Sequence, residues 1–263
     1  MKLDFACEVN IGPRPSSDDR AMILGQILDQ RFLAGEARTP AAAVVCDGCG
    51  GYLGGGVAAQ TVLETLSARG PGLYDGAEAL AQALEAAQRE LLGKKAEVYS
   101  LREMCTTVAG CLFTEEAVTL FHSGDSRVYR FDGSYLARMT VDHSMVQEMV
   151  ELGMISEKQA LSHPRRNVIT RCLGIDCRPP EIQVRGPIRP GEIYLLCSDG
   201  LWEALRPEQI EKILASPLSL GEKARLLVRA ALELGSEDNI TACLCQRPGG
   251  QEAPAAESEF ILD

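Results

Sequence analysis

Short apolar runs bounded by turn residues dominate both ends and the middle of the chain. Gly, Asp, Asn or Pro flanks each run, and these residues commonly end strands. We therefore predict strands over residues 21–28, 41–47, 106–113, 117–124, 126–132, 191–199 and 239–246. Glu115-Glu116 and Asp132-Gly133 separate consecutive runs and predict hairpin turns.

Four longer segments repeat apolar residues at helical spacing, over 56–68, 77–95, 144–161 and 219–234. The third is interrupted at Gly153, and Ser156 is placed to cap a second short helix. Ser219 and Glu222 have the spacing of a capping box at the start of the fourth segment. Because strands are grouped between helices and do not alternate with them, we predict an α+β fold in which helices cover antiparallel sheets.

The composition is that of a chain that buries a core. Of the 263 residues, 46% are apolar and 24% are charged, which excludes disorder throughout. A length of this order suits one large domain, which we place at residues 1–246. The remaining segment, 247–263, is rich in Gly, Pro and Glu and is predicted to be a disordered tail.

The charge balance excludes some partners. The net charge is −11, and an acidic surface does not attract the phosphate backbone of a nucleic acid. No apolar run approaches the ~20 residues that span a bilayer. The first residues, MKLDFACEVN, carry an acid where a signal peptide needs its apolar stretch. We therefore expect a soluble, cytoplasmic protein that binds neither nucleic acid nor membrane.

The ten cysteines are too dilute for a disulfide scaffold in a chain of this length, so we expect free thiols. Cys46 and Cys49 form a C-x-x-C, but a structural zinc site usually needs a second such pair, and none occurs. Cys172 and Arg178 match the C-x5-R of cysteine-dependent phosphatases. The stretch between them is poor in the glycines that cradle phosphate, so we reject that interpretation.

Acidic residues fall repeatedly at strand ends beside Gly or another small polar residue. The sites are Asp18-Asp19, Asp47-Gly48, Asp125, Asp199-Gly200 and Asp238-Asn239. One Asp-Gly alone is best interpreted as a turn. Five sites in the same context favour a convergent cluster of carboxylates, since a strand end holds its side chain rigidly and glycine admits a ligand. Such oxygen ligands suit Mg²⁺ or Mn²⁺ better than zinc.

Six motifs extend this interpretation. They are VVCDGCGG, HSGDSRVYRF, MTVDHSMVQEMVELGMI, HPRRNVITRCLG, CSDGLWE and EDNITA. In order and spacing they resemble the metal-dependent Ser/Thr protein phosphatases of type 2C (the PPM family) in their compact bacterial form. The resemblance runs from about residue 4 to 246 and implies a four-layer α/β/β/α sandwich of two antiparallel β-sheets flanked by helices. It also implies a flap at about 143–176 that influences substrate choice.

The resemblance implies a set of metal ligands for two Mn²⁺ or Mg²⁺ ions. Asp47 would bridge both ions. Asp199 and Asp238 would bind the first ion, and Asp18 with the backbone carbonyl of Gly48 would bind the second.

The resemblance assigns further roles around these ions. Arg14 would bind the phosphate, for which a guanidinium fork is suited. Asp19 would hydrogen-bond a metal-bound water, and Asp125 with Glu203 would hold a weaker third ion. The implied reaction is hydrolysis of phosphoserine or phosphothreonine on proteins. A metal-activated water attacks phosphorus in line, and no phosphoenzyme forms.

The chain departs from the family pattern at several of these positions. Asp18 stands where the family has Glu or Gln, and Glu203 where it has Asp. Cys49 replaces a His or Met, and Cys105 replaces the Gly before two threonines. These changes keep open an alternative function, a catalytically weak member that binds phosphoproteins as an adaptor or sensor. The resemblance further implies a monomer that acts on Ser/Thr-phosphorylated proteins beside a cognate Ser/Thr kinase.

Overall fold

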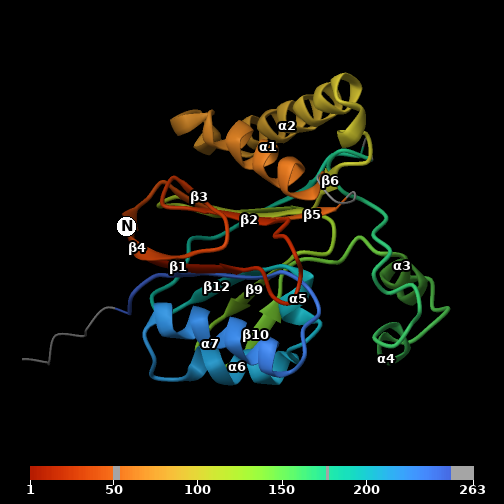
Figure 1. Cartoon of the computed structure of the whole chain (residues 1–263). Helices are drawn as coiled ribbons and strands as arrows, with labels where there is room; N and C mark the ends of the chain where they lie inside the picture. Colours follow the sequence, from red (N-terminus) through yellow and green to blue (C-terminus); the bar gives the residue numbers. More distant parts are fainter. Residues whose placement is uncertain (50–53, 176–177, 250–263) are drawn as a thin grey trace, which may run out of the picture.

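Two antiparallel β-sheets lie face to face, and helices cover the outer face of each sheet (Figure 1). The structure is a computed structural model that describes residues 1–49, 54–175 and 178–249. The arrangement confirms the predicted four-layer α/β/β/α sandwich. Most of the predicted tail, from residue 250 onward, lies outside the described residues.

The first sheet has the strand order β10-β9-β12-β13-β1-β4. Its strands are β1 (Lys2–Asn10), β4 (Phe32–Arg38), β9 (Arg127–Phe131), β10 (Leu136–Arg138), β12 (Ile193–Cys197) and β13 (Ile240–Gln246). The second sheet has the order β11-β8-β7-β5-β2-β3, and β6 pairs with β5 beside this path. Its strands are β2 (Asp19–Ile23), β3 (Gln26–Leu28), β5 (Ala41–Cys49), β6 (Cys105–Thr106), β7 (Val108–Phe113), β8 (Val118–Ser123) and β11 (Glu181–Arg185).

Helices α1 (Gly55–Ser67) and α2 (Ala77–Glu97) cover the second sheet, with the short 3₁₀ helices η1 (Gly70–Tyr74) and η2 (Tyr99–Leu101) beside them. The first sheet is covered by α5 (Asp199–Trp202), α6 (Pro207–Ala215) and α7 (Leu220–Glu233). Helices α3 (Met145–Glu151) and α4 (Glu157–Ala160) lie beside the sandwich (Figure 1). Within the described ranges, no helix combines the length and apolarity of a membrane span.

The core lies between the two sheets. Phe5 of β1 packs edge-on against Phe113 of β7, with ring centroids 6.2 Å apart, and Phe113 packs in the same way against Tyr194 of β12. Two further apolar clusters lie outside this core. One joins the second sheet to α1 and α2, and the other joins the first sheet to α5, α6 and α7. Strand β7 is buried along its whole length because the opposite sheet covers one face and helices cover the other. Apolar burial on both faces of each sheet therefore fixes the strand ends that carry the acids.

The local structure confirms most predicted elements and corrects one. The capping boxes at Ser156 and at Ser219 are present, and the helix over 144–161 is interrupted at Gly153 as predicted. The single strand predicted over 21–28 is wrong. Leu24 and Gly25, with φ of 53° and 69°, form a turn between β2 and β3, because positive φ at both central residues is the geometry of a tight hairpin.

Candidate metal centre

Carboxylates from several strand ends converge at one end of the sandwich. Asp19 of β2 and Asp47 of β5 are direct cross-strand partners. Asp199 begins α5, with one residue between it and the end of β12, and Asp238 precedes β13. Asp125 follows β8. The charges of Asp199, Asp19, Asp125 and Asp238 all act on Asp47, so the structure brings together the acids that the sequence placed at separate strand ends.

Burial and mutual repulsion disfavour ionisation of these acids. Burial, followed by the charge of Asp199, raises the pKa of Asp47 well above its usual range. Burial and the charge of Asp125 do the same to Asp199. Burial raises the pKa of Asp19 to about 6, although hydrogen bonds from two hydroxyls oppose it. Carboxylates that repel one another in a low dielectric need a compensating positive charge at neutral pH.

One carboxylate oxygen of the cluster has no partner. Asp199 Oδ1 is buried and accepts no hydrogen bond from any described residue. Buried polar atoms are normally satisfied, so an orphaned oxygen in a cluster of acids indicates a ligand position. Carboxylate oxygens are the donors that Mg²⁺ and Mn²⁺ prefer. The residues present therefore fit the binuclear centre that the family resemblance implies.

Asp19 is held by two hydroxyl groups. Ser198 Oγ and Thr241 Oγ1 each donate a hydrogen bond of 2.7 Å to its Oδ2 atom. Its side chain is 1% exposed, and Ser198 and Thr241 belong to segments far from it in the sequence. This clamp fixes the orientation of the carboxylate. Sequence reasoning missed both hydroxyls, and only their positions beside the CSDG and DNIT motifs could have drawn attention to them.

Asp18 lies against the first turn of α1. Its Oδ1 accepts a hydrogen bond of 2.8 Å from the backbone N–H of Gly56, and its own N–H donates to Asn239 Oδ1 at 2.7 Å. A Cβ at Gly48 would lie 2.1 Å from the carbonyl oxygen of Gly55. Glycine at position 48 therefore lets β5 approach α1 closely, and this approach places the Gly48 backbone next to Asp18.

Arg14 lies at the rim of the cluster. Its Nη2 donates to Asp238 Oδ2 at 2.7 Å, and its Nε donates to the carbonyl of Glu237 at 2.9 Å. The side chain is about half exposed, so the guanidinium meets both the acids and the solvent. This position suits a group that receives an incoming phosphate.

Asp125 and Glu203 are linked through α5. The indole Nε1 of Trp202 donates to the carbonyl of Asp125 at 3.0 Å. Glu203 follows Trp202, and its carboxylate lies 3.6 Å from Nε of Arg166, which belongs to the predicted flap. Burial, followed by the charge of Asp142, raises the pKa of Asp125 to about 7. Glu203 thus contacts the flap while its charge reaches Asp125.

Two stacked histidines lie at the start of the predicted flap. His122 of β8 and His143 have ring centroids 4.6 Å apart. His143 Nδ1 accepts the Gly124 N–H at 3.1 Å, and its Nε2 lies 3.1 Å from Glu181. The guanidinium of Arg171 is 3.1 Å from both His143 Nε2 and Glu181 Oε1, so the positive charge there comes from arginine. These contacts favour a structural role for both histidines.

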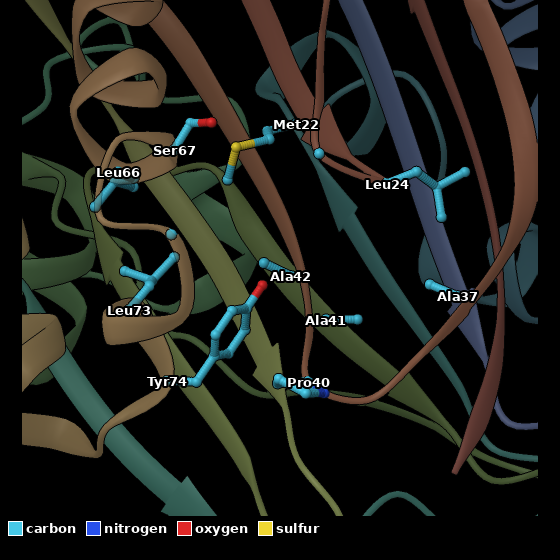
Figure 2. A pocket seen from close by; sticks show the side chains of 12 residues that line it. Met22, Leu24, Ala37, Pro40, Ala41, Ala42, Leu66, Ser67, Leu73 and Tyr74 are labelled. Carbon is cyan, nitrogen blue, oxygen red and sulfur yellow. The ribbon is translucent and has the colours of Figure 1, made fainter.

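A pocket of about 240 Å³ lies away from the acids, between β2, β5 and η1 (Figure 2). Figure 2 shows Leu73, Tyr74 and Leu66 facing Pro40, Ala41 and Ala42 across it. The described residues that line it include no charged side chain. It therefore offers nothing to a cation or a phosphate, and the carboxylate cluster remains the candidate site.

Comparisons with known proteins agree with the site. Residues 25–233 match the family model described as Protein phosphatase 2C. The Serine/threonine phosphatase stp of Listeria monocytogenes is 32% identical over 210 residues, covering 78% of this chain and 83% of the relative. The crystal structure of the Mycobacterium tuberculosis serine/threonine phosphatase PstP/Ppp superposes with a TM-score of 0.82 at 30% identity, covering 94% of this chain and all of the other. The catalytic domain of PstP in complex with two manganese ions gives a TM-score of 0.78 at 28% identity, covering 94% of this chain and 99% of the other.

Proposed function

The chain belongs to the protein phosphatase 2C family, and we propose that it hydrolyses phosphoserine and phosphothreonine on proteins at a binuclear Mn²⁺ or Mg²⁺ centre. The membership confirms the resemblance inferred from the motifs. The Mn²⁺ ions described for a similar structure support the choice of metal. Phosphorylated proteins are then the substrates, and a Ser/Thr kinase is the enzyme class that supplies them.

The ligand set we propose follows the convergent acids. Asp47 would contribute to both ions, Asp199 and Asp238 would hold one ion, and Asp18 with the Gly48 carbonyl would hold the other. A pair of such ions, when bound, acidifies water and offsets charge on a transferring phosphoryl group. The buried, unpartnered Asp199 Oδ1 is the observation that carries this assignment.

The chain's own groups orient the reaction around this centre. Arg14, at the rim, offers its guanidinium fork to two oxygens of the incoming phosphate. Asp19, fixed by Ser198 and Thr241, accepts a hydrogen bond from the attacking water. In-line attack by water needs no side-chain nucleophile, so no phosphoenzyme forms. Asp125 and Glu203 form a weaker third cation position beside the flap.

Replacement of one ligand tests the proposal. Asp199→Asn should lower hydrolysis of a phosphothreonine peptide by more than about 100-fold. Removal of a residue that only hydrogen-bonds a metal ligand can already lower activity by up to about 100-fold, and removal of the ligand itself should cost more. Asp132→Asn, in an exposed turn, is the matched control and should leave turnover unchanged. Unchanged turnover in Asp199→Asn would refute the assignment. A wild-type protein that binds Mn²⁺ and phosphopeptide without turnover would instead favour the adaptor or sensor alternative.

A further inference from the structure

Three cysteines from separate segments converge beside the proposed metal centre. Cys49 at the end of β5 is the cross-strand partner of Cys105 in β6. A β-bridge between Thr106 and Leu173 brings Cys172 to the same place. The sulfurs of Cys49 and Cys105 are 2.6 Å apart, and all three sulfurs lie within 4.8 Å of one another. Figure 1 shows β6 beside β5 at this end of the sandwich.

The surroundings of the three sulfurs suit a ligand. Cys105 and Cys172 are 4% and 3% exposed, whereas Cys49 is half-buried and so opens the cluster to solvent. Lys95 lies next to the cluster, and its Nζ donates to the carbonyl of Gly174 at 2.5 Å. Hydrogen bonds from Cys172 and Cys49, helped by the positive charge of Lys95, lower the pKa of Cys105 to about 4, so Cys105 supplies a thiolate, the form that binds metals. The hydrogen bond to Cys105 raises the pKa of Cys172 to about 12.

We propose that Cys49, Cys105 and Cys172 bind one thiophilic divalent ion of the Zn²⁺ class, at a site distinct from the carboxylate cluster. Zinc–sulfur bonds of about 2.3 Å place the sulfurs of a tetrahedral site roughly 3.8 Å apart. Binding an ion would therefore move the sulfurs of Cys49 and Cys105, 2.6 Å apart, away from each other within a cluster whose sulfurs all lie within 4.8 Å. Three sulfur ligands with one solvent-facing position leave room for a fourth ligand from solution. Thiolates select soft ions, so Mg²⁺ does not compete for this site.

The three cysteines are close enough to the proposed catalytic centre for an ion bound to them to affect it. Cys49 follows Gly48, and the hydroxyl of Thr106 donates to the carbonyl of Asp47 at 3.0 Å. An ion held by all three sulfurs therefore joins the end of β5, β6 and the loop that continues from the flap. The Cys46–Cys49 pair of the sequence does not form this site, because Cys46 is fully buried and is not a member of the cluster.

Cobalt binding tests the site without reference to turnover. The full chain is reduced, stripped of metal and given excess Mg²⁺ to occupy the carboxylates, and then one equivalent of Co²⁺ is added. Sulfur ligands give Co²⁺ a charge-transfer absorption that oxygen ligands do not. We expect this band in the wild type and in Cys46→Ala, and its loss when Zn²⁺ displaces Co²⁺. Cys49→Ser, Cys105→Ala and Cys172→Ala should weaken binding by about 100-fold or more.

Because Cys49 is half-buried, a serine at this position does not disturb the core, so Cys49→Ser removes a sulfur ligand without unfolding the protein. As a second measurement, Zn²⁺ should slow alkylation of Cys49 in the folded wild type, read by mass spectrometry. Absence of the band in the wild type, a band retained in Cys49→Ser, or a band lost in Cys46→Ala would each overturn the proposal. So would a peroxide-formed disulfide between Cys49 and Cys105 in a protein that never shows the band.

Discussion

The electrostatic cost of gathering the acids of the cluster can be measured at Asp125. This side chain is 6% exposed, and burial with the charge of Asp142 raises its pKa from the ordinary 3.8 to about 7. At 1.36 kcal/mol for each pH unit, the difference corresponds to about 4 kcal/mol of unfavourable ionisation in the folded protein. Asp125→Asn removes the charge and keeps the shape, so it should stabilise the metal-free fold at pH 8 by up to about 4 kcal/mol.

The pH dependence gives this prediction its direction. Because the folded pKa lies above the unfolded one, the folded state binds the proton more tightly. The wild type is then most stable, relative to Asp125→Asn, below pH 3.8, and it loses that stability as the pH rises to about 7. The gain from the substitution should therefore grow from nothing near pH 3.8 to its full size above pH 7.

Urea unfolding of metal-stripped protein at pH 5 and pH 8 measures this gain. Asp132→Asn is the control: its carboxylate is exposed, and hydrogen bonds from Ser134 and Tyr135 lower its pKa, so no stabilisation is expected at pH 8. Saturating Mn²⁺ should shrink the gain in Asp125→Asn, since cations offset the repulsion. An equal gain at both pH values, or none, would refute the reasoning.

Substitutions at three further positions test parts of the site. Arg14→Ala should lower kcat/KM by roughly 10–100-fold through loss of charge-assisted hydrogen bonds to phosphate, and Arg14→Lys should recover only part of it in steady-state assays. Ser198→Ala removes one of the two hydroxyls that lower the pKa of Asp19, so the acidic limb of the pH–rate profile should move upward; an unmoved limb would contradict the role of Asp19. Gly48→Ala brings a Cβ within 2.1 Å of backbone and should cost about 3 kcal/mol in urea unfolding, whereas Gly186→Ala, which meets nothing within 4 Å, should change stability by less than about 0.5 kcal/mol.

The sequence predicts the acidic residues of this site better than the residues that hydrogen-bond to them. Asp47, Asp199 and Asp238 could be anticipated because each ends or begins a strand beside glycine or asparagine, a pattern that local sequence shows. Ser198, Thr241 and Asn239 could not, since their role is to contact Asp18 or Asp19. Such contacts depend on which strands become neighbours.

The fold shows the same division between local and long-range information. The helix over 219–234 carried its own capping box and was predicted to within a residue at each end. The turn at Leu24 was missed because a leucine with positive φ is unusual, and only the pairing of β2 with β3 reveals it. Likewise, the meeting of Cys49, Cys105 and Cys172 follows from strand pairing, which their spacing in the sequence does not show.

The most direct test of the central claim is metal-dependent hydrolysis of a phosphothreonine peptide by the wild-type protein. Phosphate release is followed with Mn²⁺, then with excess EDTA, and then after fresh Mn²⁺ is added. The buried carboxylate cluster predicts turnover with Mn²⁺, its loss in EDTA and its return with metal. Turnover that is indifferent to EDTA but stopped by a thiol alkylator would contradict the account and assign the chemistry to a cysteine.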